Sequence, residues 1–255
     1  MIPEFADVLA NKSSDPVASS PAAIPAIGPE RDYALDIGSC ISRGWLLLKN
    51  NFWPLVGVTF LVTIAMGVLN QVLGLITGPV INQMVLNHKV TASGLMIVVL
   101  VSIASAPIYV VFMAGLFQYY LKLIRGEPAT VGDAFSGFGP ATGQLILLGL
   151  VQNVLVWIGC LLCIVPGIYL VTAWYFAVPL AIDRKLGFWE ALETSRKRVN
   201  KHWFLVFAFL LVNGLVSVSG ILGCCVGIFV TLPIGLGAML YAYETAFSAA
   251  APQNE

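Results

Sequence analysis

Charged residues are scarce in this chain of 255 residues. Lys and Arg contribute 13 residues and Asp and Glu another 13, so charged side chains make up 10% of the chain, against about 25% in soluble domains. Hydrophobic residues make up 58%, and the mean hydropathy is +0.89. This composition excludes an ordinary soluble globule and indicates a helical membrane protein with several spans.

Residues suited to redox or metal chemistry are also few. The chain has 5 Cys and 2 His, and the cysteines are too few and too apolar in their surroundings for a disulfide framework. Cys160 and Cys163 form a CxxC pair, and Cys224 adjoins Cys225, but no His or acidic residue accompanies the four. A redox or metal site is one interpretation. Small packing residues are the other interpretation, which we favour.

The sequence contains no recognisable catalytic arrangement. There is no Ser-His-Asp order, no phosphate-binding glycine loop and no pair of carboxylates. No Asp, Glu, Lys, Arg or His lies in the middle of an apolar segment, where ionisable residues mark proton and ion pathways. We therefore predict no catalytic residue, no cofactor, no metal site and a protein that is not an enzyme.

Six long apolar segments predict an all-α, polytopic membrane protein with six transmembrane helices. The expected spans are residues 53–76, 95–121, 144–165, 167–182, 203–222 and 226–247. The fourth is short against the ~20 residues that cross a bilayer upright, and Arg184 and Lys185 can extend their side chains to the interface. The polar residues 77–93 are expected to form the loop between the first two spans.

An amphipathic segment precedes each pair of spans and is expected to be an interfacial helix. The three segments are residues 32–51, 130–138 and 187–201. Thr130 and Asp133 in the second segment have the spacing of a capping box. The third has a mostly apolar stripe at helical spacing, made of Phe188, Leu192, Ser195 and Val199, and should lie on the membrane surface.

Three regions are predicted along the chain. Residues 1–31 are rich in Ala, Pro and Ser and are expected to be a disordered tail. Residues 32–248 form the six-span domain, and residues 249–255 form a short polar tail.

Basic residues gather on one side of the predicted membrane. That side carries 12 of the 13 Lys and Arg, and the other side carries only Lys89. The positive-inside rule makes the first side cytoplasmic, with both termini on it. Anionic lipid headgroups are the expected partners of the basic cluster, at ~1 kcal/mol per residue, rather than nucleic acid. The residues predicted to contact them are Arg184, Lys185, Arg196, Lys197, Arg198 and Lys201.

Uncharged amides occur at membrane depth. Gln152 and Asn153 lie in the third predicted span and Asn213 lies in the fifth. One interpretation is a polar-lined pathway. The other, which we favour, is hydrogen bonding between helices.

Three stretches resemble a broad family of bacterial six-span membrane proteins. They are CIVPGIYLVTAWYFAVPLAIDRKLGFWEALETSRKRVNKHW (163–203), GWLLLKNNFWPL (44–55) and LKLIRGEPATVGDAFSGF (121–138). The family includes the membrane domain fused to some glycerophosphoryl diester phosphodiesterases and the YciC-like proteins. The resemblance covers residues 32–247 and implies six helices with interfacial helices between hairpins, in the bacterial inner membrane. It implies no settled activity, and this chain lacks the phosphodiesterase domain.

These observations leave three functional hypotheses. We favour a structural, scaffolding or lipid-organising unit without enzymatic activity. The alternative is a transporter or channel for a small or lipidic solute, which a polar-lined cavity reached from one side would support. A membrane enzyme acting on lipids is the least supported, because no set of acids, bases or nucleophiles converges.

Overall fold

The computed structural model describes residue 33 and residues 35–88, 91–222 and 227–247, with the backbone alone at 221–222. The predicted tails and the pair Cys224–Cys225 lie outside the described residues. The described residues form nine α-helices and one 3-10 helix, with no strand among them. The prediction of an all-α membrane protein is confirmed, since six helical segments are long and apolar enough to cross a membrane.

The first two long helices extend beyond the predicted spans. α3 covers Phe52–Leu86 and α4 covers Ala92–Ile124, so the prediction that residues 77–86 form a loop is wrong. Pro79 lies inside α3 without ending it. A helix of 35 residues is about 52 Å long, well above the ~30 Å of a hydrocarbon core. Polarity in residues 77–86 therefore marks the end of the apolar stretch rather than the end of the helix.

The third pair of helices contains a break that the sequence pattern did not predict. α5 covers Thr142–Leu162, and the fourth span is divided into α6, Ile164–Ala173, and α7, Ala177–Asp183. Pro179 has no N–H with which to bond the carbonyl of Tyr175, which favours an interruption just before it. At the break, the N–H of Ala177 bonds to the carbonyl of Trp174 at 3.1 Å. The carbonyl of Ala173 accepts a hydrogen bond from the Ser195 hydroxyl at 2.8 Å.

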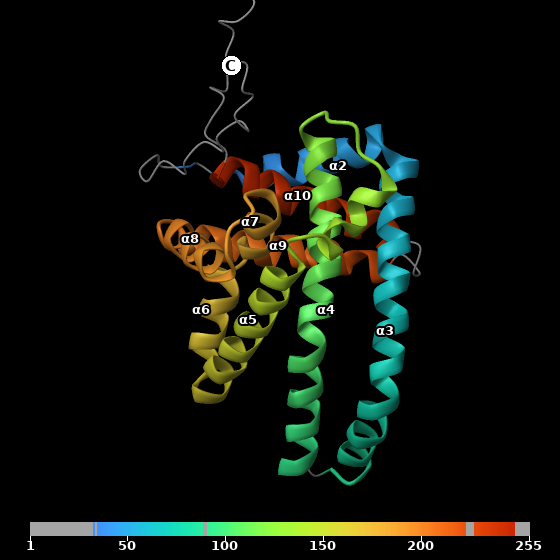
Figure 1. The fold of residues 1–255 in the computed structure, drawn as a ribbon, viewed down its shortest axis with the longest axis vertical. Coiled ribbons are helices and arrows are strands. Elements are labelled where there is room, and N and C mark those ends of the chain that lie inside the picture. The colour runs from blue at the N-terminus through green and yellow to red at the C-terminus, as the bar shows by residue number, and fades with distance from the viewer. Residues whose placement is uncertain (1–32, 34, 89–90, 223–226, 248–255) are drawn as a thin grey trace, which may run out of the picture. The chain divides into compact units, whose positions relative to one another are not determined.

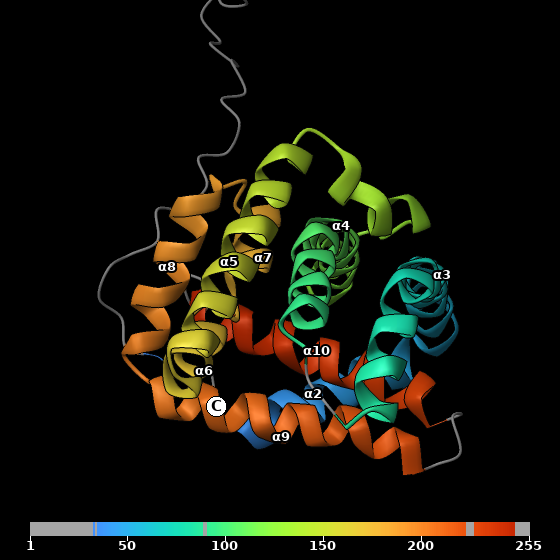
Figure 2. The same ribbon diagram turned by 90° about the horizontal axis from the view of Figure 1, so that it is seen from below.

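The last two long helices run across the direction of the first two. α9 covers Trp203–Leu222 and α10 covers Ile228–Phe247, and both lie crosswise to α3 and α4 (Figures 1 and 2). The amphipathic helix α2, Ile37–Asn50, packs along α10. Gly44 permits this close approach, because a Cβ there would lie 2.7 Å from the carbonyl oxygen of Ile234.

The other two amphipathic segments are helical as predicted. The 3-10 helix η2, Val131–Phe138, has the capping box formed by Thr130 and Asp133. α8 covers Phe188–Asn200 and packs against α5, α6 and α7. Three members of its stripe, Leu192, Ser195 and Val199, are buried, so the stripe packs on protein; contact of α8 with the membrane stays a prediction.

Candidate functional site: a cavity and the polar network beyond its closed end

A cavity of about 550 Å³ lies between α4, α5, the α6–α7 segment and α10. Its wall is mostly apolar, with a few hydroxyl and amide groups. The lining residues are Ser102, Ser105, Ala106, Tyr109, Val110, Met113, Phe117, Gly149, Gln152, Asn153, Val156, Val171, Trp174, Tyr175, Val178 and Met239.

The amides of α5 reach the cavity because of their helical spacing. Gly149, Gln152, Asn153 and Val156 lie three and four residues apart, so they share the face of α5 that is turned to the cavity. Gly149 brings α5 close to α4, since a Cβ there would lie 3.1 Å from the Cα of Pro107. The two amides are thereby held at the wall by a tight helix contact.

The carbonyl oxygens of Gln152 and Asn153 are buried and accept no hydrogen bond from any described residue. The two serine hydroxyls of the wall are engaged within their own helix: Ser102 donates to the carbonyl of Val99 at 2.8 Å, and Ser105 donates to that of Ser102 at 3.1 Å. The Tyr175 hydroxyl accepts from Asn213 at 3.3 Å. An unpaired buried acceptor costs about 1–3 kcal/mol. The two amides are therefore the groups in this wall best suited to hydrogen bond with a bound molecule.

The two ends of the cavity differ in exposure. Val171 on α6 is 41% exposed, whereas Phe117, Trp174 and Met239 are 4%, 6% and 9% exposed. On α4, Phe117 lies toward the C-terminal end of the helix, which Arg125 follows, and Ser102 lies toward the N-terminal end. The cavity is thus closed by large buried side chains at the end where the basic residues gather.

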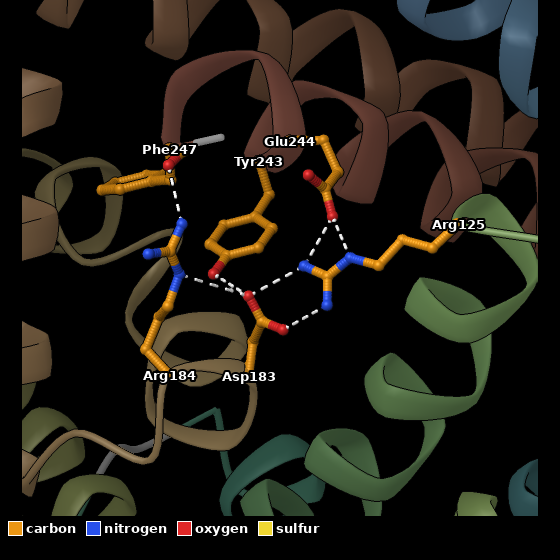
Figure 3. A network of polar contacts seen from close by, with 6 residues as sticks. All are labelled: Arg125, Asp183, Arg184, Tyr243, Glu244 and Phe247. Atoms are coloured by element: carbon orange, nitrogen blue, oxygen red, sulfur yellow. Dashed lines mark hydrogen bonds and ion pairs between the residues drawn. The ribbon is translucent and has the colours of Figure 1, made fainter. Parts of the chain in front are cut away.

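A network of polar contacts lies beyond this closed end (Figure 3). Arg125 follows α4 and donates from its two terminal nitrogens to the carboxylate of Asp183 on α7, at 2.6 and 2.9 Å. Its Nε donates to Glu244 on α10 at 2.8 Å, and the Tyr243 hydroxyl donates to Asp183 at 2.7 Å. Hydrogen bonding to Asp183 raises the pKa of the Arg125 guanidinium, which keeps it charged.

Two further arginines bind the C-terminal end of α10. Arg184 donates to the carbonyl of Phe247 at 2.9 Å, and Arg198 on α8 donates to that of Ala246 at 2.7 Å. The last carbonyls of a helix have no partner within the helix and carry partial negative charge. Two cations therefore satisfy the end of α10 and fasten α7 and α8 to it.

The network joins helices that also line the cavity. On α10, Tyr243 comes one turn after the lining residue Met239, and on α7, Asp183 comes five residues after Val178. α4 contributes Phe117 to the cavity, and Arg125 directly follows its last residue. These three segments therefore contribute to the cavity wall and are joined to one another by the polar network beyond its closed end.

The structure separates the predicted group of membrane-depth amides. Asn213 on α9 does not line the cavity; its Nδ2 donates to the carbonyl of Gly235 at 3.1 Å and to the hydroxyl of Tyr175 at 3.3 Å. Its NH₂ group thus joins α9 to α10 and to a residue of the cavity wall, whereas its Oδ1 is buried without a partner among the described residues. Gln152 and Asn153 line the cavity, as a polar pathway would require.

The predicted lipid-contacting residues also divide into two kinds. The lysines Lys185, Lys197 and Lys201 are exposed, and of these Lys197 also pairs with Glu193 at 3.5 Å. The arginines are engaged with the protein, since Arg196 forms an ion pair with Glu193 at 2.7 Å and the other two bind the end of α10. The pairing with Arg196 lowers the pKa of Glu193 to about 2. Headgroup contact thus stays a prediction, best suited to the lysines.

The cysteines that the structure describes are free thiols. Cys160 and Cys163 are exposed, while Cys40 on α2 is buried, and burial raises the pKa of its thiol to about 11. Among the described residues, no group of three or more His, Cys, Asp or Glu could hold a metal ion.

Sequence reasoning missed the network of Arg125, Asp183 and Glu244. Along the chain, Asp183 and Glu244 are 58 and 119 residues from Arg125. No local spacing in the sequence links the three. The available signal was their position, because each lies at or just past the end of a predicted span. Charges at three span ends on one side of a membrane can meet there.

Comparison with known proteins shows remote relatives. An uncharacterized protein of Mycobacterium bovis is 26% identical over 138 residues, which are 51% of this chain and 40% of that protein. Uncharacterized proteins of two Mycobacterium tuberculosis strains are 26% and 25% identical over the same length and shares. The chain thus spans about 40% of the length of these relatives. No family model and no solved structure matches.

Proposed function

We propose that this integral membrane protein binds a small or lipidic solute in the cavity between α4, α5, α6–α7 and α10, and that it moves or presents this solute without covalent chemistry. The observation that carries the proposal is the pair of unpaired amide oxygens, Gln152 and Asn153, in the wall of a cavity of about 550 Å³. Small-molecule sites have this character: volumes of about 300–1,000 Å³ and mostly apolar walls with a few convergent polar groups.

The cavity favours solute handling over a purely structural role. A unit that only scaffolds has no need of a cavity with two neighbouring amides in its wall whose buried oxygens lack partners, since such oxygens cost stability. The structural hypothesis retains support from Asn213 and from the end of α10, where polar groups join helices. Both roles fit one molecule, with the network holding the bundle together and the cavity holding the solute.

A cavity-filling substitution tests the proposal. Ala106→Phe places a large side chain in the cavity, and Ala104→Phe, on an exposed part of the same helix, is the matched control. Protein purified in mild detergent is extracted, and the co-purifying small molecules are quantified by mass spectrometry. We expect Ala106→Phe to lose a species that the wild type and Ala104→Phe retain. Identical extracts from all three proteins would refute solute binding in the cavity.

The proposal includes a placement in the membrane. The basic end of the molecule, with the polar network, faces the cytoplasm, and both termini lie on that side of a bacterial inner membrane. The asymmetry of 12 basic residues to 1 supports this, and so does the resemblance of residues 32–247 to the six-span family. Exposed lysines of α8 and its flanks then face anionic headgroups.

Labelling of single cysteines tests the orientation. In a background without native cysteines, Asn87→Cys places a probe just past the end of α3, and Glu127→Cys places one just past the end of α4, both at exposed positions. A membrane-impermeant maleimide added to intact cells should label the cysteine at 87 and leave that at 127 unlabelled until the cells are broken. The reverse pattern would invert the topology.

A further inference from the structure

We infer that the ligand of this cavity is an uncharged, single-chain amphiphile whose headgroup donates hydrogen bonds to Gln152 and Asn153. The inference rests on the proposed function, because it names the class of solute for the same cavity. Three observations carry it: the charge of the wall, the state of its polar atoms, and the side chains that surround them.

The wall of the cavity carries no formal charge. None of the lining residues is Asp, Glu, Lys, Arg or His. Beyond its closed end, Arg125 is already paired with both Asp183 and Glu244. A charged ligand would lose its hydration without gaining a counter-ion, at a cost of several kcal/mol. The cavity therefore selects against carboxylates, phosphates and ammonium groups.

The unpaired polar atoms in the wall are hydrogen-bond acceptors, so a ligand that pairs with them must be a donor. The oxygens of Gln152 and Asn153 are buried acceptors without partners among the described residues. The hydroxyls of Ser102 and Ser105 already donate to carbonyls of their own helix, so they do not serve these amides. A hydroxyl or carboxamide headgroup supplies the missing donor, and it can also accept from the amide NH₂ groups.

The rest of the wall suits an apolar body. Met113, Phe117, Trp174 and Met239 line the cavity toward its closed end. Methionine is unbranched and adapts to the shape of a bound chain. A volume of about 550 Å³ is that of a site for one small molecule, which fits a single apolar chain better than a two-chain phospholipid.

Matched photoactivatable probes test this inference on the full-length protein in lipid nanodiscs. The probes are a single-chain aliphatic alcohol with a diazirine in the chain, and the carboxylate and primary ammonium analogues of equal chain length. Cross-linked residues are mapped by peptide mass spectrometry, and affinity is measured by competition with the unmodified alcohol. We expect the alcohol to label cavity residues and both charged analogues to label them at least about tenfold more weakly.

Variants of the amides complete the test. Gln152→Leu/Asn153→Leu should weaken binding of the alcohol about tenfold, since two hydrogen bonds of about 0.5–1.5 kcal/mol each are lost. The matched control is Asn70→Leu/Gln71→Leu, which removes two exposed amides of α3 and should leave binding unchanged.

The outcomes separate this inference from the proposed function. Equal labelling of the cavity by charged and uncharged probes would overturn the inference on charge while solute binding stands. Unchanged affinity in the Gln152→Leu/Asn153→Leu variant would overturn the role of the headgroup in the same way. Labelling that avoids the cavity, together with no effect of Ala106→Phe, would overturn the proposed function as well.

Discussion

The cavity and the polar network lie on the same helices, yet their polar groups are in opposite states. In the network, the carboxylate of Asp183 receives hydrogen bonds from Arg125 and Tyr243. In the cavity, the oxygens of Gln152 and Asn153 receive none from the described residues. One region contains strong charges that are paired, and the other contains weak dipoles that are unpaired.

This difference separates the two roles of polar groups in an apolar protein. A buried charge is costly unless it is paired, so a complete ion network fastens helices and loses much when one partner is removed. An uncharged amide can be left unpaired at a smaller cost and can then bind a ligand. Substitutions in the network should therefore impair folding, and substitutions in the cavity should impair binding.

The largest effect is expected for Asp183→Asn. It removes the charge opposite Arg125 from a side chain that is only 9% exposed, while Arg125 itself is 36% exposed and keeps its ion pair with Glu244. We therefore expect a loss of about 1.5–3 kcal/mol, the contribution of hydrogen bonds to a charged group. Unfolding by increasing SDS in mixed micelles measures the loss. Glu127→Gln, at an exposed acid, is the control, and an equally small loss in both would show that the network does not stabilise the bundle.

A smaller loss is expected for Asn213→Leu. It removes the hydrogen bonds to Gly235 and Tyr175, and interhelical hydrogen bonds in membranes contribute about 0.6 kcal/mol on average and at most about 1.7. The same SDS titration should show a loss near 1 kcal/mol. If Asn213→Leu is as stable as the wild type, this amide does not join α9 to α10 in the way we describe.

A still smaller, pH-dependent effect is expected at the ion pair of Lys122 and Asp133, whose atoms lie 2.7 Å apart. Burial would raise the pKa of Asp133, but hydrogen bonds from Lys122 and Thr130 outweigh it, so the pKa is lowered. Its stabilisation is therefore present above the unfolded-state pKa, about 3.9, and is lost as the pH falls further through the folded-state value. We expect at most about 1 kcal/mol, because the pair is partly exposed.

The variant Asp133→Asn provides the comparison for this effect. It should be less stable than the wild type at neutral pH, and the difference should shrink as the pH is lowered below about 4. Thermal unfolding across this range, by loss of helical circular dichroism, gives the measurement. A constant difference at all pH values would assign the effect of the substitution to packing instead.

The smallest effect on stability is expected for Gln152→Leu/Asn153→Leu. Both side chains lack partners among the described residues, so replacing them with apolar groups of similar size removes no hydrogen bond between helices. In the SDS titration, the double variant should therefore show no loss of stability relative to the wild type, and removal of the two unpaired acceptors can make it more stable. A loss as large as that of Asn213→Leu would remove the contrast between the two sets of amides.

The sequence alone was sufficient to predict the helices and the class of protein, a helical membrane protein. Apolar segments of span length predicted six membrane-length helices because an apolar solvent requires every backbone group to be satisfied within its own segment. Helical spacing predicted a helix at 187–201, where the structure has α8 at Phe188–Asn200, and the spacing of Thr130 and Asp133 predicted the element that became η2. Both signals are local. Helix ends were less predictable where local signals misled, as at Pro79 inside α3 and at the break before Pro179.

Only the tertiary structure decided what each polar residue does. Asn153 and Asn213 are the same residue type in similarly apolar surroundings, yet one lines a cavity and the other joins two helices. Arg125 meets Asp183 and Glu244 across separations of 58 and 119 residues. Such encounters depend on how the helices cross. The crossings depend in turn on packing contacts such as that of Gly44 of α2 against α10 and that of Gly149 of α5 against α4. Apolar packing is non-directional and leaves no pattern along the chain that would identify the partner.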